Sequence, residues 1–204
     1  LERRGYVLRD GEKRYRSLFR LERDLPWSED LVVRARAELA RLVERTGQAA
    51  ELLTVRGNDL YWYDKLEPAE QPVRIVAQPG FLRSLYELDA PSRLALRMRG
   101  LEAVERTMDR SHFRGVLAGK EALPWEQARR RIHETDPAAV VFDERGNSNG
   151  IRRYAVAVRE RQGQFRFLYA IAEAALPAHD ARAHRHAILT ALLESRKKIE
   201  GALP

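Results

Sequence analysis

The sequence predicts an α+β fold built on a mostly antiparallel sheet. Segments typical of helices and strands follow in the order helix, three strands, helices, one strand, a strand pair and a last helix. Two observations carry this prediction. Residues 31–43 repeat apolar side chains at helical spacing, and residues 165–172 alternate between two faces as a strand does. We expect a helix end and hairpin at residues 1–16, a linker helix at 17–27 and the α+β domain at 28–204.

The first sixteen residues resemble the second half of a winged helix-turn-helix. Gly5 is placed to end a helix, and Asp10-Gly11 is a strong hairpin signal between two β-type runs. We expect the cationic side chains of this segment to contact DNA phosphates. They are Arg3, Arg4, Arg9, Lys13, Arg14 and Arg16. The alternative is a solvated edge hairpin whose charges prevent aggregation. Because the chain opens at Leu1 inside this helix end, we expect an upstream part that carries the base-reading helix.

The elements of the larger domain are predicted from caps, turn signals and apolar periodicity. Ser28 is placed to cap a helix that Gly47 ends, with one apolar stripe facing the core. Strands are expected at residues 49–55, 60–67, 73–77, 138–142, 151–159 and 165–172. Further helices are expected at residues 91–98, 101–108, 125–134 and 179–200.

The last strand pair indicates where a ligand can bind. One face of residues 165–172 is bulky and aromatic, and we expect it to pack against the long first and last helices of the domain. The other face of the pair carries mostly small side chains, which leave space above the sheet for a ligand. Arg153 lies on this small face, where its guanidinium can hold a carboxylate bidentately. The alternative is that Arg153 lies at the sheet edge, in solvent or paired with Asp143 or Glu144.

Composition excludes several classes of protein. The chain has 204 residues and no cysteine, which excludes disulfide scaffolds, zinc–thiolate sites and thiol catalysis. It holds no apolar run near the ~18 residues that a membrane span needs, and its charged start is unlike a signal peptide, so we expect a cytoplasmic protein. The net charge of +7 favours a polyanionic partner, but arginine is abundant throughout and this gives the total little weight.

No constellation typical of an enzyme is present. The chain lacks a nucleophile elbow, a phosphate-binding loop and a zinc-protease helix motif. Asp180 and His184 stand four residues apart and are able to share a metal, but a solvated helix end explains them better. We therefore expect no catalytic residue, no metal site and no cofactor.

The order and spacing of several weak motifs resemble the IclR family of bacterial transcription regulators. Residues 57–67 are similar to the hairpin and second strand of its effector-binding domain, and residues 80–96 are similar, without gaps, to its loop and helix. Residues 5–18 resemble the family's wing. Residues 150–158 and 163–172 resemble its final strand pair. The resemblance covers nearly the whole chain.

The resemblance implies a GAF-like domain, with helices on one face of the sheet and an effector pocket on the other. The effector-binding residues that it implies are Tyr86, Leu88, Asp89, Ala90, Ile151, Arg153, Ala170 and Ala172. It also implies operator DNA as a partner, dimers paired through the winged helices, and tetramers formed through the sensor domains. An organic acid is one effector class that Arg153 suits.

The sequence departs from the family's pattern at several positions of the expected pocket. The departures are Ser84, Tyr86, Pro91, Ser92, Ala157, Ala170 and Ala172. The loss of hydroxyl groups from the last strand argues for a less polar ligand, or for one held mainly through Arg153. Two alternatives therefore stay open: a stand-alone GAF-like sensor or interaction module without DNA binding, and an IclR-like protein whose pocket no longer binds a ligand.

Overall fold

A computed structural model describes residues 7–9, 15–17, 29–70, 75–115, 122–175 and 181–203. The chain divides into two compact units, Leu1–Val32 and Val33–Pro204. In the part of the chain that the structure describes, no helix is long and apolar enough to span a membrane.

The first unit contains the predicted hairpin. Strand β1 (Val7–Arg9) pairs antiparallel with β2 (Tyr15–Ser17), which confirms the two strands. The turn residues Asp10 and Gly11 lie outside the described residues. Ser17 pairs with Val7, so the helix expected from residue 17 does not begin there. The rest of residues 17–27 lies outside the described part of the chain.

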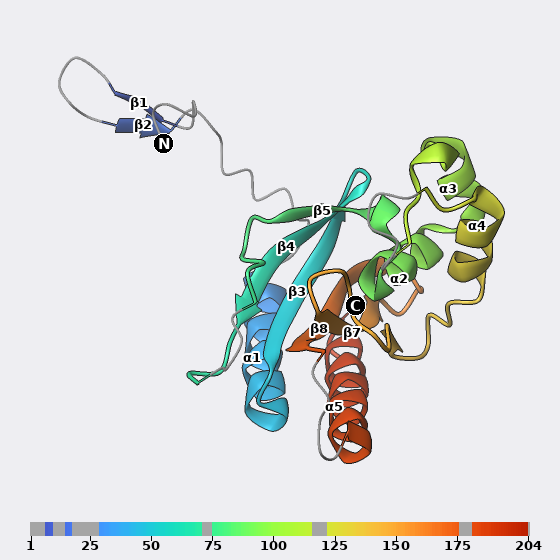
Figure 1. Ribbon diagram of the computed structural model, residues 1–204. Coiled ribbons are helices and arrows are strands. Elements are labelled where there is room, and N and C mark those ends of the chain that lie inside the picture. Colours follow the sequence, from blue (N-terminus) through green and yellow to red (C-terminus); the bar gives the residue numbers. More distant parts are fainter. Residues whose placement is uncertain are drawn as a thin grey trace. The chain divides into compact units, whose positions relative to one another are not determined.

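The second unit is built on a six-stranded antiparallel sheet, which confirms the predicted fold class (Figure 1). The strands follow the order β5-β4-β3-β8-β7-β6 across the sheet. They are β3 (Ala49–Arg56), β4 (Asp59–Leu66), β5 (Leu82–Ser84), β6 (Val141–Phe142), β7 (Ile151–Arg159) and β8 (Phe165–Ala174). The central pair, β3 and β8, joins the two hairpins β3–β4 and β7–β8, which lie far apart in the sequence.

The third predicted strand is wrong in position. Residues 75–77 form no strand, and residues 73 and 74 lie outside the described part of the chain. Ile75 and Ala77 are buried, which explains their apolar pattern, but their carbonyl groups accept hydrogen bonds from the Lys65 side chain. The strand that follows β4 in the chain and pairs with its outer edge is β5, which comes after the turn at Gly80.

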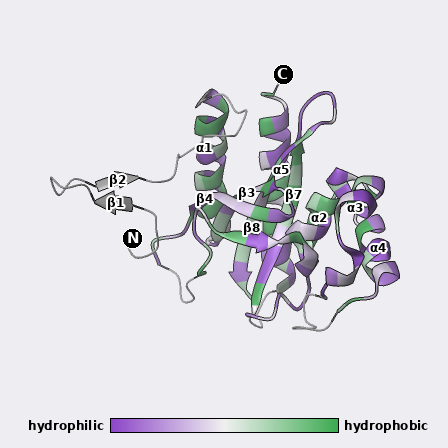
Figure 2. Ribbon diagram, turned by 90° about the horizontal axis from the view of Figure 1, so that it is seen from above, coloured by the Kyte–Doolittle hydropathy of each residue, from purple (hydrophilic) through white to green (hydrophobic). Residues whose placement is uncertain are grey.

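Two long helices cover one face of the sheet. They are α1 (Glu29–Thr46) and α5 (Ala181–Glu200), which lie on the same side of the sheet in both views (Figures 1 and 2). The predicted packing of the bulky strand face against these helices is confirmed for Phe167, Tyr169 and Ile171, but it is wrong for Phe165, which packs against the apolar cluster on the opposite face. The Tyr169 hydroxyl donates to the Ala35 carbonyl of α1 at 3.1 Å, and Phe167 and Ile171 are fully buried. Burial raises the pKa of Tyr169 far above its usual range, with a further contribution from Glu38.

Shorter helices cover part of the opposite face. They are α2 (Ala90–Arg99), α3 (Leu101–Thr107) and α4 (Trp125–His133). The single turn η2 (Leu85–Glu87) precedes α2, and the single turn η3 (Arg110–His112) lies between α3 and α4. One apolar cluster contains Leu94 of α2 together with Ala155, Ala157 and Ala170 of the strand pair. These alanines therefore pack against other side chains, whereas the small strand face was expected to stay open above them.

Candidate functional site

The candidate site lies on the sheet face that carries the small side chains. Lys65, Glu51 and Ala170 stand in register across β4, β3 and β8, and Ala155 of β7 continues the row. Because side chains two residues apart share a strand face, Arg153 of β7 lies on the same face as Ala155. The sheet therefore brings three charged side chains from three strands to one surface.

Arg153 forms a buried ion pair with Glu51. Its Nε lies 2.7 Å from Oε2 of Glu51, and its Nη2 lies 3.1 Å from Oε1, which is a bidentate geometry. Arg153 is 6% exposed and Glu51 is 0% exposed. Burial alone would lower the pKa of the Arg153 guanidinium, but the Glu51 charge and its hydrogen bonds outweigh burial and raise it. Glu51 therefore occupies one bidentate edge of the Arg153 guanidinium, which was expected to bind an effector carboxylate.

The acidic residues proposed as alternative partners of Arg153 bind elsewhere. Asp143 accepts hydrogen bonds from the backbone N–H of Ala90 and from Nη1 of Arg93, each at 2.7 Å. Glu144 accepts two hydrogen bonds of 2.7 Å from Arg185 of α5. Arg153 is therefore paired within the sheet, and the solvent-exposed edge position considered for it is wrong.

Lys65 is buried beside this pair and its ammonium group is fully engaged. Its Nζ donates to the carbonyls of Ile75 at 2.6 Å and Ala77 at 2.9 Å, and it lies 2.7 Å from Oε1 of Glu67. An ammonium group has three N–H donors, so these three acceptors satisfy it.

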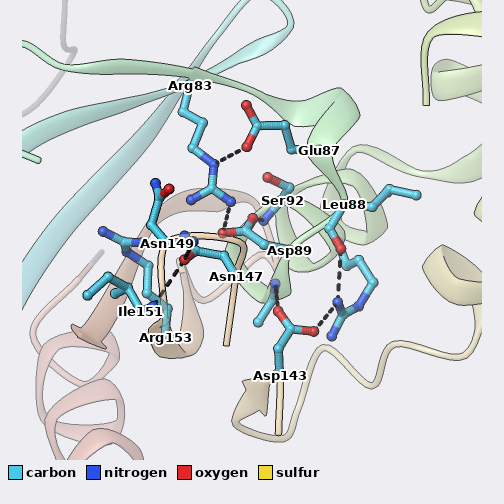
Figure 3. A network of polar contacts seen from close by, with 12 residues as sticks. Arg83, Glu87, Leu88, Asp89, Ser92, Asp143, Asn147, Asn149, Ile151 and Arg153 are labelled. Atoms are coloured by element: carbon cyan, nitrogen blue, oxygen red, sulfur yellow. Dashed lines mark hydrogen bonds and ion pairs between the residues drawn. The ribbon is translucent and has the colours of Figure 1, made fainter. Parts of the chain in front are cut away.

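Asp89 and Arg83 form the polar centre of the loop before α2 (Figure 3). The Asp89 carboxylate caps α2 by accepting a hydrogen bond from the Ser92 backbone N–H at 3.1 Å, and it pairs with Arg83. Nε of Arg83 also donates to Glu87 at 2.8 Å. Burial would raise the pKa of Asp89, but Arg83, Ser92 and Arg153 outweigh it and hold that pKa below its usual value.

The eight residues predicted to bind an effector do not form one cluster. Asp89 lies close enough to Arg153 for its pKa to respond to that charge, and Leu88 and Ala170 belong to one apolar cluster. Ile151 packs beside Ala172 in a second apolar cluster. The Tyr86 side chain packs against the same apolar cluster as Leu88 and Ala170, from a partly buried position. The centre of its ring lies 5.1 Å from that of Phe113, and its hydroxyl accepts a hydrogen bond from the Asp109 backbone N–H.

Asp143 clamps the start of α2, where Ala90 lies. It joins the backbone N–H of Ala90 to Arg93, and Arg93 also donates to the Leu88 carbonyl at 2.9 Å (Figure 3). Leu88 itself has a left-handed backbone, with φ of 46°, and its side chain is fully buried. Non-glycine residues adopt this conformation at a cost of roughly 1–2 kcal/mol, which the clamp and the burial of Leu88 offset.

One buried polar group near these charges has no hydrogen-bond partner among the described residues. It is Nε1 of Trp62, whose side chain is fully buried. Trp62 lies beside the ion pair, because its ring centre is 5.2 Å from Cζ of Arg153. Ser92 lies in the first turn of α2, and its backbone N–H and hydroxyl both hold the Asp89 pKa down. Unpaired buried polar groups are costly, and in native proteins they usually have a reason.

A separate groove of about 960 Å³ lies between the end of α4 and residues 139–146. Its lining includes Arg93, Arg131, Glu134, Phe142 and Asp143. None of the eight predicted effector-binding residues lines it, although Asp143 and Arg93 join its wall to the loop before α2.

The remaining predicted residues are placed only in part. Arg9 and Arg16 belong to the paired strands β1 and β2, and the other four cations expected to contact DNA lie outside the described residues. Asp180 also lies outside them. His184 contacts Glu173, with 2.6 Å between its Nε2 and Oε2 of the carboxylate, and the described residues contain no group of three potential ligands able to hold a metal.

Several residues that shape the site were missed by the sequence analysis. Glu51, Lys65 and Arg83 pair with charges that come from other strands or loops, and Trp62 was treated as an ordinary strand residue. A charged residue in the middle of an otherwise apolar strand, as in residues 49–53, was the available signal for Glu51.

Solved structures of bacterial transcription regulators share this fold. An IclR transcriptional regulator from Alicyclobacillus acidocaldarius matches with a TM-score of 0.71 and 20% identity, over 98% of this chain and 80% of that one. An IclR homolog from Microbacterium hydrocarbonoxydans, complexed with 4-hydroxybenzoate, gives the same score, identity and coverage. The IclR of Thermotoga maritima matches with a TM-score of 0.63 and 18% identity, over 98% and 82%. Neither a family model nor a curated protein sequence matches the chain.

Proposed function

We propose that this protein is a transcriptional regulator of the IclR type, whose sensor domain at residues 28–204 binds a small effector and modulates DNA binding. The observation that carries the proposal is the extent of the structural likeness. The match to the regulator from Alicyclobacillus acidocaldarius covers 98% of this chain. The match to a structure that holds a single domain of another IclR-family regulator covers only 84%. The longer match reaches beyond a sensor domain alone, which supports a winged helix at the N-terminal end.

The proposed effector site lies between the loop before α2 and the strands β7 and β8. It includes Asp89, Ala90, Ile151, Arg153 and Ala172, with Leu88 and Ala170 in the apolar wall behind them. Tyr86 contributes through the position of the loop, because its side chain packs on Phe113. A ligand bound here shifts the protein between two states only by its different affinity for each. We propose that the change reaches the DNA-binding part through α1 and the linker at residues 17–27.

The proposed DNA contacts are made by the cations of residues 1–16. Arginine and lysine side chains on a wing hold phosphates and position the protein without reading sequence. A dimer of such units suits a palindromic operator, because the two-fold symmetry of the protein matches that of the site. We propose a homodimer or homotetramer, which light scattering of the intact protein tests directly.

The decisive test separates the two halves of the function. The intact protein is incubated with random duplex DNA, and the bound fraction is sequenced. Enrichment of a palindrome with half-sites about 10 base pairs apart is the result that a winged-helix dimer gives. A library that stays random after repeated selection would overturn the DNA-binding half and favour a stand-alone sensor. A ligand that then weakens or strengthens operator binding tests the sensor half.

A further inference from the structure

We propose that Glu51 sets the ligand class of the effector site: it occupies the carboxylate position on Arg153, so the site takes an uncharged ligand with hydrogen-bond acceptors. This inference rests on the proposed function, because it concerns the ligand of the same site. It differs from the expectation of an organic acid, for which Arg153 would have to be available.

The geometry around Arg153 is that of a bound carboxylate. Both oxygen atoms of Glu51 lie within 3.1 Å of guanidinium nitrogen atoms, and the pair is shielded from solvent. A ligand carboxylate would have to displace Glu51 or share Arg153 with it. Displacement would leave Glu51 buried without a partner, which is strongly unfavourable in a dry site. Sharing would place two carboxylates on one guanidinium, whose single positive charge balances only one of them.

The other cations near Arg153 offer no alternative anchor. Lys65 is satisfied by two carbonyls and Glu67, and Arg83 is shared between Glu87 and Asp89. Each of the three cations of the site, counting Arg153, is therefore already paired with a carboxylate of the protein. A carboxylate ligand would add a negative charge that none of these paired cations is left to balance, and like charges brought together in a buried site repel.

The unpartnered Nε1 of Trp62 indicates what the ligand supplies. This indole nitrogen is only a donor, so it needs an acceptor. An uncharged molecule with a carbonyl, amide or hydroxyl oxygen can satisfy it without adding charge. The apolar side chains of Leu88 and Ala170 suit a compact, partly apolar body.

The first test compares ligands that differ only in charge. Calorimetry of the full chain is run with 4-hydroxybenzoate against 4-hydroxybenzamide, and with benzoate against benzamide. We expect each amide to bind the native protein about tenfold or more tightly than its acid, and this preference to reverse in Glu51→Ala. Tighter binding of the acids by the native protein, lost in Arg153→Ala, would overturn the proposal.

The second test needs no knowledge of the natural ligand. Glu51→Ala removes the internal carboxylate and leaves Arg153 unpaired, so acetate or propionate should fill the position and raise the melting temperature in a saturable way. The same acids should leave the native protein and the double variant Glu51→Ala/Arg153→Ala unchanged. Glu144→Ala is the matched control, because Glu144 also pairs bidentately with an arginine but is 62% exposed.

The outcomes separate the inference from the function on which it rests. Rescue of Glu51→Ala by acetate, with no effect on the native protein, supports the assignment of Glu51. Saturable stabilisation of the native protein by acetate through Arg153, or absence of rescue in a folded Glu51→Ala or Glu51→Ser protein, would overturn it. The DNA selection described above fails or succeeds independently of all these results.

Discussion

Arg153 of β7 and Glu51 of β3 form their ion pair across β8, the strand that separates them. Their neighbours on β8 are Ala172 and Ala170, and the two charged side chains meet above these alanines. The alanines leave the space that the two long side chains need. The small strand face that was interpreted as room for a ligand is therefore occupied, at these positions, by side chains of the protein itself.

Arg153→Ala should lower the free energy of unfolding by about 3–5 kcal/mol, because it leaves the Glu51 carboxylate buried and unpaired. The double variant Glu51→Leu/Arg153→Met, which removes both charges and keeps apolar volume, should lose much less. Urea unfolding of the three proteins measures this. Equal losses in the single and double variants would mean that packing, and not the charge pair, is responsible. The loss of ligand response in Arg153→Ala alone consequently cannot identify Arg153 as a ligand anchor.

Local sequence signals determine some features of this protein, and long-range strand pairing determines others. The strand at residues 151–159 was predicted with its observed bounds, because two-residue alternation and the glycine before it are local signals. The partner of Arg153 could not be predicted in the same way. Glu51 lies 102 residues away, and only the pairing of β3 with β8 brings it close. Residues 75–77 show the opposite case. The apolar pattern correctly predicts that Ile75 and Ala77 are buried, but these residues form no strand, and the Ile75 carbonyl accepts a hydrogen bond from Lys65.

Asp89 should make part of the stability depend on pH in the acidic range. Its pKa in the folded protein lies below the model-peptide value of 3.8, so its stabilising contribution is present above about pH 4. This contribution is lost as the pH falls through the lower, folded-state pKa. The melting temperature of the native protein should therefore fall more steeply between about pH 4 and pH 2 than that of Asp89→Asn, which keeps a capping side chain.

Asp109→Asn is the control for this experiment. Asp109 also caps a helical turn, and hydrogen bonds from Ser111 lower its pKa, but its carboxylate is exposed to solvent. We expect Asp109→Asn to follow the native pH profile closely. If Asp89→Asn does so as well, the buried contact between Asp89 and Arg83 contributes nothing measurable to acid stability.

Asp143→Ala should destabilise the start of α2. The change removes hydrogen bonds to the Ala90 backbone and to Arg93, two partners that are at least partly buried, and we expect a loss of roughly 2–4 kcal/mol. Amide hydrogen exchange should show the loss most strongly in residues 88–93. Glu144→Ala, one residue away and exposed, should change stability by less than about 1 kcal/mol. Similar losses in the two variants would rule out a clamp that is specific to Asp143.

The wing should determine how steeply operator binding depends on salt. Each phosphate contact made by a lysine or arginine contributes about 0.9 to the slope of log affinity against log salt concentration. The double substitution of Arg14 and Arg16 by glutamine should therefore flatten the slope by about two. Fluorescence anisotropy with the selected operator measures it between about 50 and 200 mM salt. A slope equal to that of the native protein would place these side chains outside the DNA interface.

Leu88 combines a strained backbone with a buried side chain, and substitution separates the two effects. Leu88→Gly relieves a left-handed conformation worth roughly 1–2 kcal/mol but removes a side chain from the core, which costs about 2–5 kcal/mol. We expect a net loss of stability in urea unfolding. Gly57→Ala calibrates the backbone cost, because Gly57 has φ of 58° and open space around the added methyl group. A net gain in the stability of Leu88→Gly would mean that backbone strain at Leu88 outweighs the burial of its side chain. A ligand that lets Leu88 leave the left-handed conformation would then act by releasing this strain.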